Sequence, residues 1–179
     1  MSRWREGNCR PPLSFLPAGR VTWAAIAAGA PAFIARARAR RVGRGKLGEG
    51  IRYEEKAHAY LASLSDYYMP GPWLTFTSEI SAHRIRFCQP DGLILDFVRG
   101  ALTLVEIKLK HTQAAWWQTR HLYEPVLRHI FRDWSIAIVE VAKWIDPHTP
   151  FPEHYKFASR EQLPNLSPGS FSLHLYSTR

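Results

Sequence analysis

Residues 101–109, ALTLVEIKL, are apolar at nearly every position, yet they include Glu106 and Lys108 near the end of the run. A strand that is apolar on both faces is typical of the centre of a sheet that is covered on both sides. Side chains alternate along a strand, so Glu106 and Lys108 point to the same side, together with Leu102 and Leu104. The segment therefore predicts a central strand that places a carboxylate and an ammonium at the edge of an apolar face.

The patterns around this strand predict an α/β fold. They are, in chain order, a helix over 51–64, a loop over 65–73, strands over 73–80 and 83–95, a hairpin turn over 96–100, the central strand, a helix over 112–131, and strands over 134–144 and 171–176. Pro90, Asp91 and Gly92 interrupt the second strand, and Pro125 is expected to kink or split the second helix. The segment 171–176 alternates as an edge strand does. The whole predicts a mixed central β-sheet flanked by helices, with a core in the order αβββαβ.

Nearly all of the excess positive charge lies in the first fifty residues. The formal net charge is +9, and residues 1–50 hold ten basic and two acidic residues. Six of these cations, which we call the arginine-rich cluster, are Arg36, Arg38, Arg40, Arg41, Arg44 and Lys46. Such clustering favours a nucleic-acid backbone as the partner. A solvated tail and a contact with an anionic membrane surface are the alternatives.

This charge distribution divides the chain into two parts. Residues 1–46 are expected to form a basic N-terminal arm that is partly helical, with short alanine-rich helices over 24–28 and 31–41. Glycines then predict a hinge, at Gly43, Gly45, Gly48 and Gly50. Residues 47–179 are expected to form the main domain, with a C-terminal extension from about 146.

Several classes of protein are excluded by what the sequence lacks. Two cysteines, Cys9 and Cys88, are too few for a disulfide framework and fit a reducing compartment. The longest mainly apolar run, residues 21–35, is shorter than the roughly 20 residues of a membrane span. The sequence has no zinc H-E-x-x-H, esterase G-x-S-x-G, Walker A or Rossmann pattern, which argues against those enzymes. We therefore expect a soluble intracellular protein without a membrane partner.

Asp91 is expected to form a charged cluster with Glu106 and Lys108. Its strand and the central strand should be hairpin neighbours across the turn at 96–100, which brings its carboxylate close to Glu106. Two carboxylates and an ammonium at the edge of an apolar sheet are costly to bury unless a ligand binds them. Mg²⁺ favours oxygen ligands of this kind. Lys108 would then position or deprotonate an attacking water and offset negative charge on a phosphate.

Pro90-Asp91, followed after a gap by Glu106-Ile107-Lys108, resembles the motif of the PD-(D/E)XK nucleases. This superfamily includes restriction enzymes, phage exonucleases, Holliday-junction resolvases and RecB-like nucleases. The resemblance covers about residues 47–145 and implies a restriction-endonuclease-like core. It implies that Asp91, Glu106 and the backbone carbonyl of Ile107 hold Mg²⁺, for which Mn²⁺ would substitute. The cysteines for the iron–sulfur cluster of some relatives are absent.

Two helices would add residues to this site. In many members a glutamate of the first core helix reaches the metal; Glu54 and Glu55 are the candidates. Glu54 is favoured because it shares the apolar stripe with Ala57. In RecB-like members the helix after the E-x-K strand has a glutamine, and Gln118 occupies the corresponding position in this sequence. The usual Gln-x-x-x-Tyr spacing is absent, because Tyr123 follows five residues later.

Three further side chains lie close to the motif in the sequence. Lys110, just past the central strand, would contact phosphate, with a solvated strand end as the alternative. Trp116 and Trp117 are adjacent on the expected helix, so at least one is expected in the core. Stacking on unpaired bases is their alternative role.

These expectations combine into a Mg²⁺-dependent DNA nuclease that hydrolyses phosphodiester bonds through a metal-activated water. Its catalytic residues would be Asp91, Glu106, Lys108, Glu54 and Gln118, and its backbone-binding residues the arginine-rich cluster and Lys110. By analogy, its role would be the processing, recombination or packaging of DNA of a phage or mobile element. It would then be located in a bacterial or virus-infected cell, or be associated with the virion. The alternative is a non-catalytic DNA-binding or virion-assembly module on the same fold. Endonuclease or exonuclease action, a homodimer and a protein partner stay open.

Overall fold

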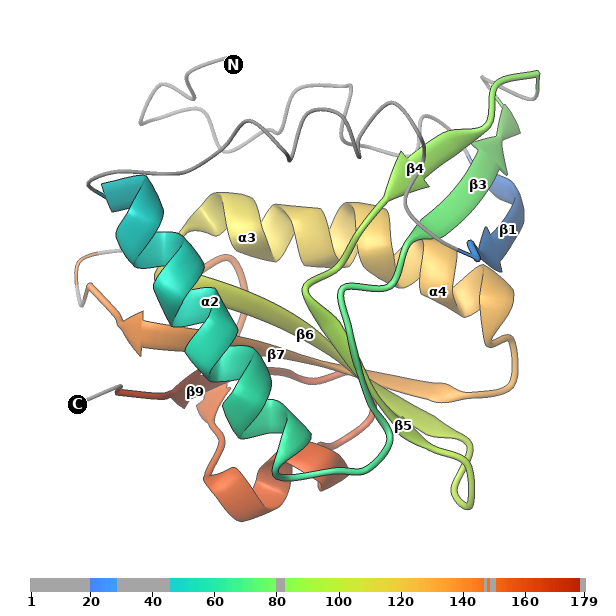
Figure 1. Cartoon of the computed structure of the whole chain (residues 1–179). Helices are drawn as coiled ribbons and strands as arrows, with labels where there is room; N and C mark the ends of the chain where they lie inside the picture. Colours follow the sequence, from blue (N-terminus) through green and yellow to red (C-terminus); the bar gives the residue numbers. More distant parts are fainter. Residues whose placement is uncertain (1–19, 29–45, 80–82, 147, 149–150, 178–179) are drawn as a thin grey trace.

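A six-stranded mixed sheet lies at the centre of the molecule (Figure 1). The computed structural model describes residues 20–28, 46–79, 83–146, 148 and 151–177 of the chain. The strands in spatial order are β2 (Tyr68–Pro70), β5 (Gly92–Asp96), β6 (Ala101–Lys110), β7 (Ser135–Trp144), β9 (Phe171–Leu175) and β8 (Lys156–Phe157). β2, β5 and β6 pair antiparallel, whereas β6, β7, β9 and β8 pair parallel. The expected mixed sheet is confirmed.

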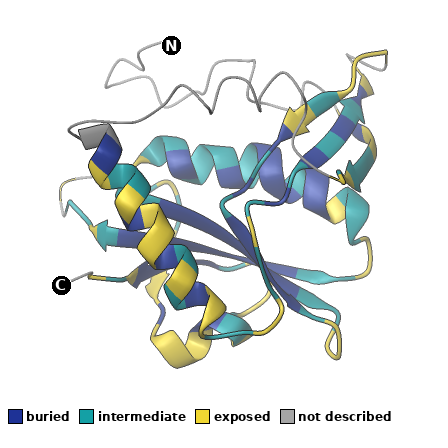
Figure 2. Cartoon of the chain, viewed as in Figure 1, coloured by how far each residue is buried: buried dark blue, intermediate teal, exposed yellow. Residues whose placement is uncertain are grey.

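Helix α2 (Lys46–Ala62) covers one face of this sheet. Its residues Tyr53, Ala57 and Leu61, each four apart, share one side of the helix and are buried against Val105 and Ile107 of β6. Figure 2 shows this contrast, with a largely exposed outer side of α2 and strands that are buried along most of their length. The spacing of apolar residues thus sets which side of α2 faces the sheet.

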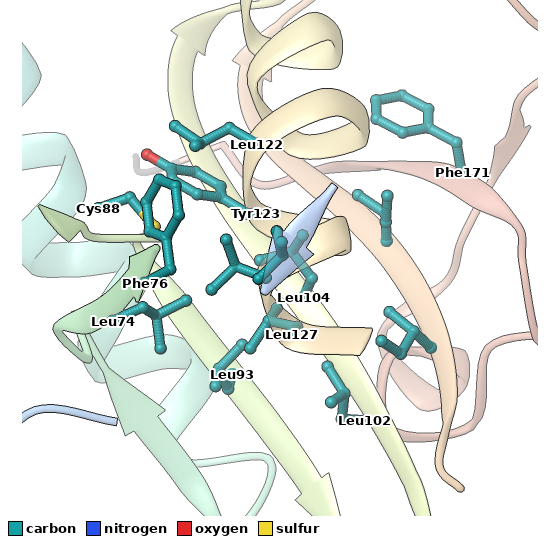
Figure 3. Close-up of a cluster of buried hydrophobic side chains, with 14 of the residues drawn as sticks. Leu74, Phe76, Cys88, Leu93, Leu102, Leu104, Leu122, Tyr123, Leu127 and Phe171 are labelled. Atoms are coloured by element: carbon teal, nitrogen blue, oxygen red, sulfur yellow. The ribbon is translucent and has the colours of Figure 1, made fainter. Parts of the chain in front are cut away.

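The opposite face of the sheet packs against a second helical layer. It consists of α3 (Gln113–Gln118), the π-helical turn η2 (Thr119–Tyr123) and α4 (Glu124–Ile130). Leu102 and Leu104 of β6 meet Leu122 and Leu127 of this layer in the larger of the two apolar cores (Figure 3). The alternation of β6 therefore separates two cores, one on each side of the sheet. A short 3₁₀ helix, η3 (Arg160–Asn165), precedes β9.

Three more strands form a small second sheet in the order β1-β3-β4. They are β1 (Val21–Ile26), β3 (Leu74–Ser78) and β4 (Arg86–Cys88), all antiparallel. Phe76 and Cys88 on its inner side join the core under α4 (Figure 3). The helix expected over 24–28 is wrong, because these alanines follow Val21 and Thr22 in a strand that pairs with β3. The helix expected over 31–41 lies outside the described residues.

Other differences from the expected elements have similar causes. α2 begins at Lys46, so Gly48 and Gly50 form part of its first turns rather than a hinge; Gly43 and Gly45 are outside the described residues. The expected loop over 65–73 contains β2, and the strands expected over 73–80 and 83–89 leave the main sheet as β3 and β4. The strand expected at the edge, β9, lies between β7 and β8 instead. The differences in β2, β3, β4 and β9 concern pairings between distant segments, which periodicity does not report.

Pro125 does divide the second helix, as expected. It lies in the first turn of α4, and the turn before it is widened, so that the N–H of Glu124 donates to the carbonyl of Thr119, five residues back. A proline cannot donate the next backbone hydrogen bond, and a π-turn accommodates that gap without ending the helix. Within the described residues, no helix is both long and apolar enough to cross a membrane.

Gly92 offers a test of the packing beside Asp91. A Cβ atom on Gly92 would lie 2.6 Å from the hydroxyl oxygen of Tyr68, which is itself 2.6 Å from Nδ1 of His58. We expect Gly92→Ala to lower the free energy of unfolding by about 1 to 3 kcal/mol, because the tyrosine must shift. Urea unfolding with a double-mutant cycle measures this. In a Tyr68→Ala background the cost should fall below 1 kcal/mol; an equal cost in both backgrounds would contradict the steric explanation.

Candidate functional site

The β5–β6 hairpin brings Asp91 beside the end of β6. The pairing of the two strands runs from Asp96 opposite Ala101 to Gly92 opposite Val105 and stops there. Asp91 is the residue before β5, and its Oδ2 atom accepts a hydrogen bond of 2.6 Å from the backbone N–H of Ile107. The carboxylate thus takes the place of a backbone partner where the ladder ends, and this bond holds it against the strand.

Lys108 joins the two carboxylates. Its Nζ atom lies 3.7 Å from Oδ2 of Asp91 and forms an ion pair with Oε1 of Glu106. The exposed fraction of the side chain is 2% for Glu106, 22% for Asp91 and 33% for Lys108. The structure therefore brings together the three residues expected from the sequence, in a cluster that is buried at one end and open to solvent at the other.

Burial controls the electrostatics of this cluster. It raises the pKa of Glu106 to about 8, against the opposing effect of the Lys108 ammonium. Burial likewise raises the pKa of Asp91, although Lys108 and the Ile107 amide both favour its ionised form. For Lys108, burial alone lowers the pKa, but Glu106 and Asp91 outweigh it and keep the amine charged. The cluster also retains a buried carboxyl oxygen, Oε2 of Glu106, with no hydrogen-bond partner among the described residues.

The backbone of Ile107 adds another oxygen to this side. In a strand, the N–H and C=O of one residue point toward the same neighbour. Because the N–H of Ile107 points to Asp91, its carbonyl faces the same side, beyond the last paired residue of β5. The donor set that the sequence suggested for a metal, Asp91, Glu106 and the Ile107 carbonyl, is therefore compatible with the backbone direction.

Glu54 lies across a small hollow from Asp91. The hollow has a volume of about 260 Å³ and is lined by Glu54, His58, Pro70, Gly71, Gln89, Pro90 and Asp91. The Glu54 side chain is 49% exposed, with Oε1 3.6 Å from Nε2 of His58. The expectation that Glu54 shares the buried stripe is wrong, because the buried side of α2 passes through Tyr53. Glu54 nevertheless lines the hollow beside Asp91, whereas Glu55 does not.

Gln118 reaches the cluster through Tyr123. Its side-chain amide donates a hydrogen bond to the Tyr123 hydroxyl across the π-turn. Burial raises the pKa of Tyr123 well above its usual value, and the nearby Glu106 and Asp91 raise it further. The tyrosine hydroxyl is thus bonded to Gln118 and is close enough to the two carboxylates for their charge to raise its pKa. The five-residue spacing, which departs from the usual four, is bridged because the helix is widened at this turn.

The expected nucleic-acid contacts are described only in part. Arg36, Arg38, Arg40, Arg41 and Arg44 lie outside the described residues, as does the side chain of Lys46. Lys46 begins α2, whose first turns lie against the ends of β6 and β7. There Lys143 donates to Glu49 at 2.8 Å, and Gly50 lies beside Leu109. The described domain therefore resumes, at Lys46, near the ends of β6 and β7.

A second buried acid went unnoticed in the sequence. Glu140 of β7 is the register partner of Glu106, so the two side chains share one face of the sheet. Its Oε2 atom is 2.7 Å from Nδ1 of His111, both side chains are at most 1% exposed, and His111 stacks on Phe151. An acid within the apolar run SIAIVEVAKW is the same signal that pointed to Glu106. This signal, an acidic residue within an apolar strand, would have predicted Glu140 as well.

Comparison of the chain with protein-family models, with curated proteins and with solved structures finds no match in any of the three. The chemistry of the site therefore rests on its own geometry. Among the described residues, no three or more His, Cys, Asp or Glu side chains are grouped so that they could hold a metal ion. A cation at Asp91 and Glu106 would need further oxygens from the backbone, water or substrate, which is the usual situation for Mg²⁺.

The Glu140–His111 pair provides a test of how much the polar side of the core contributes to stability. We expect His111→Ala to lower the free energy of unfolding by about 3 to 5 kcal/mol, because Glu140 is then buried without its partner. Urea denaturation measures the change. The exposed His83 is the control, and His83→Ala should stay within about 0.5 kcal/mol of wild type. A similarly small loss for His111→Ala would show that the pair is not coupled to folding.

Proposed function

We propose that this protein is a metal-dependent DNA nuclease of the PD-(D/E)XK type. One observation supports this most directly. The Asp91 carboxylate accepts a hydrogen bond from the Ile107 amide near the end of the central strand, and Lys108 contacts both Asp91 and Glu106. Two carboxylates and an amine at the end of a sheet are the groups needed to bind a hard cation and to assist a water nucleophile.

The order and direction of the elements favour the same proposal. α2, β2, β5, β6, the α3–α4 layer and β7 follow one another as αβββαβ. β2, β5 and β6 are antiparallel neighbours, and β7 is parallel to β6. The β3–β4 hairpin lies between β2 and β5 in the chain and leaves for the second sheet. With that hairpin treated as an insertion, the order of the remaining elements supports the proposed restriction-endonuclease-like core.

Mg²⁺ or Mn²⁺ fits the residues present. The unpartnered Oε2 of Glu106, the Asp91 carboxylate and the Ile107 carbonyl would hold it, with Glu54 acting across the hollow directly or through water. When bound, the cation supplies Lewis-acid polarisation of the phosphate and lowers the pKa of a water molecule. Asp91 and Glu106 would then be less costly to keep ionised while buried.

Lys108 would orient the water for in-line attack and neutralise the charge that develops on the phosphate. In the net reaction the water oxygen bonds to phosphorus, the bond to the leaving sugar oxygen breaks, and that oxygen takes up a proton. The ammonium is suited to this role because Asp91 and Glu106 keep it charged and fix its position. Gln118 and Tyr123 would orient the carboxylates from the opposite helix.

The decisive experiment is cleavage of linear, supercoiled and branched DNA with Mg²⁺, Mn²⁺ or EDTA. Wild type should cut only with a divalent cation, and Asp91→Ala and Lys108→Ala should each lose at least 100-fold in rate, about 2.7 kcal/mol of the barrier. DNA binding by all three proteins without any cleavage would instead support a non-catalytic binding module on this fold.

Glu54 and Glu55 form a matched pair for testing the contribution of α2. Both are exposed residues of one helix, but only Glu54 lines the hollow beside Asp91. We expect Glu54→Gln to raise the Mg²⁺ concentration needed for half-maximal cleavage about tenfold, because a carboxylate at the metal is lost. Glu55→Gln should leave it unchanged. Titration of the cleavage rate with Mg²⁺ measures both, and equal effects would remove Glu54 from the site.

The arginine-rich cluster should supply backbone affinity without chemistry. Deleting residues 1–46 would also remove β1, so we suggest replacing Arg36, Arg38, Arg40, Arg41 and Arg44 by Gln instead. If each arginine meets a phosphate, the slope of log affinity against log salt should fall by about 4, with the rate at saturating DNA nearly unchanged. The control replaces five exposed cations elsewhere in the described chain, Arg52, Lys56, Arg84, Arg132 and Lys156. An unchanged slope in the cluster variant would contradict the assignment.

A further inference from the structure

Trp144, the last residue of β7, lies exposed on the same side of the sheet as the charged cluster. In the parallel β6–β7 pair, Glu106 is opposite Glu140, Lys108 opposite Ala142 and Lys110 opposite Trp144. Paired residues of neighbouring strands face the same way, and every second residue returns to that face. Trp144 is therefore on the face of Glu106 and Lys108, about 13 Å along the strand direction from Glu106, at about 3.3 Å per residue.

The indole of Trp144 is unusually open for a tryptophan. Its exposed fraction is 49%, although the residues of the same strand from Ile136 to Ala142 are all buried. Lys110 Nζ lies over the ring, 4.7 Å from its centroid, and is 2.7 Å from Oδ2 of Asp146. Lys110 thus covers one face of the ring and is itself paired with Asp146, and the exposed part of the indole presents a flat apolar surface beside this ion pair.

The two tryptophans that the sequence suggested for base stacking are placed differently. Trp116 packs against the larger apolar core, and Trp117 stacks on His121 at a centroid distance of 4.0 Å. Both indole nitrogens are buried. The expectation that at least one belongs to the core is confirmed for Trp116, which leaves Trp144 as the better-placed ring for an external ligand.

We propose that Trp144 is a stacking platform for an unpaired base and that Lys110 contacts the adjoining phosphate. This rests on the proposed nuclease function and names its substrate class, which is DNA with unpaired nucleotides near the cleaved bond. Bases within a duplex already stack on both sides, whereas an unpaired base offers a free face to an aromatic ring. At about 3.4 Å per nucleotide of a stacked strand, the platform lies about four nucleotides from the metal ligands.

Binding of short fluorescent oligonucleotides in EDTA tests the platform apart from cleavage. Trp144→Ala should weaken binding of a single strand about tenfold, with less than a twofold change for a blunt duplex of the same sequence. Trp144→Phe keeps an aromatic face and should stay within threefold of wild type. Trp23 of β1 is 47% exposed and lies in the other sheet, so Trp23→Ala is a matched control that should change neither affinity.

The outcomes separate this inference from the nuclease proposal. An unchanged single-strand affinity in Trp144→Ala, or an equal loss for strand and duplex, would overturn the platform whether or not the protein cuts DNA. Single-strand binding that depends on Trp144 without cleavage under any metal condition would overturn the nuclease and leave the platform standing. If wild type binds neither oligonucleotide, the platform is overturned, and the cleavage experiment alone decides the nuclease proposal.

Discussion

The hydrogen bond from the Ile107 amide to the Asp91 carboxylate is the contact on which the rest of the site depends. At this point β5 has ended, and β6 continues with an amide that has no strand beside it on that side. An ionised acceptor makes a stronger and shorter bond than a neutral one, so the carboxylate is well suited to close the ladder. The bond holds the Asp91 carboxylate 3.7 Å from Nζ of Lys108 and in the lining of the hollow beside Glu54.

The sheet face under the α3–α4 layer has apolar side chains in one half and acidic side chains in the other. Leu102, Leu104 and Ile138 fill one half with apolar packing, whereas Glu106 and Glu140 occupy the next positions along the same strands. Buried charges add little net stability, even when they are paired. The apolar half must therefore hold the strands in register so that the polar half can keep its charged groups in place.

Local patterns were enough to predict the parts of the molecule that are set by neighbouring residues. Continuous apolar runs predicted β6 and β7, and hairpin geometry predicted that Asp91 lies near Glu106. Local patterns could not show that β1 pairs with β3 or that β9 lies inside the sheet, because such pairings join distant segments. Glu54 was assigned to the buried side of α2 because the stripe could be drawn through Ala57 from either Tyr53 or Glu54, and packing selects the bulkier apolar tyrosine.

The π-turn before Pro125 has a consequence for how proteins of this kind are compared. In an α-helix, side chains four apart share a face, but the widened turn lets Gln118 meet Tyr123 with one residue more between them. The extra residue is thus absorbed within the helix, with no loop to reveal it. A search that demands fixed spacing would count the pair as lost, and an ungapped alignment through this helix would be shifted by one position on one side of the turn.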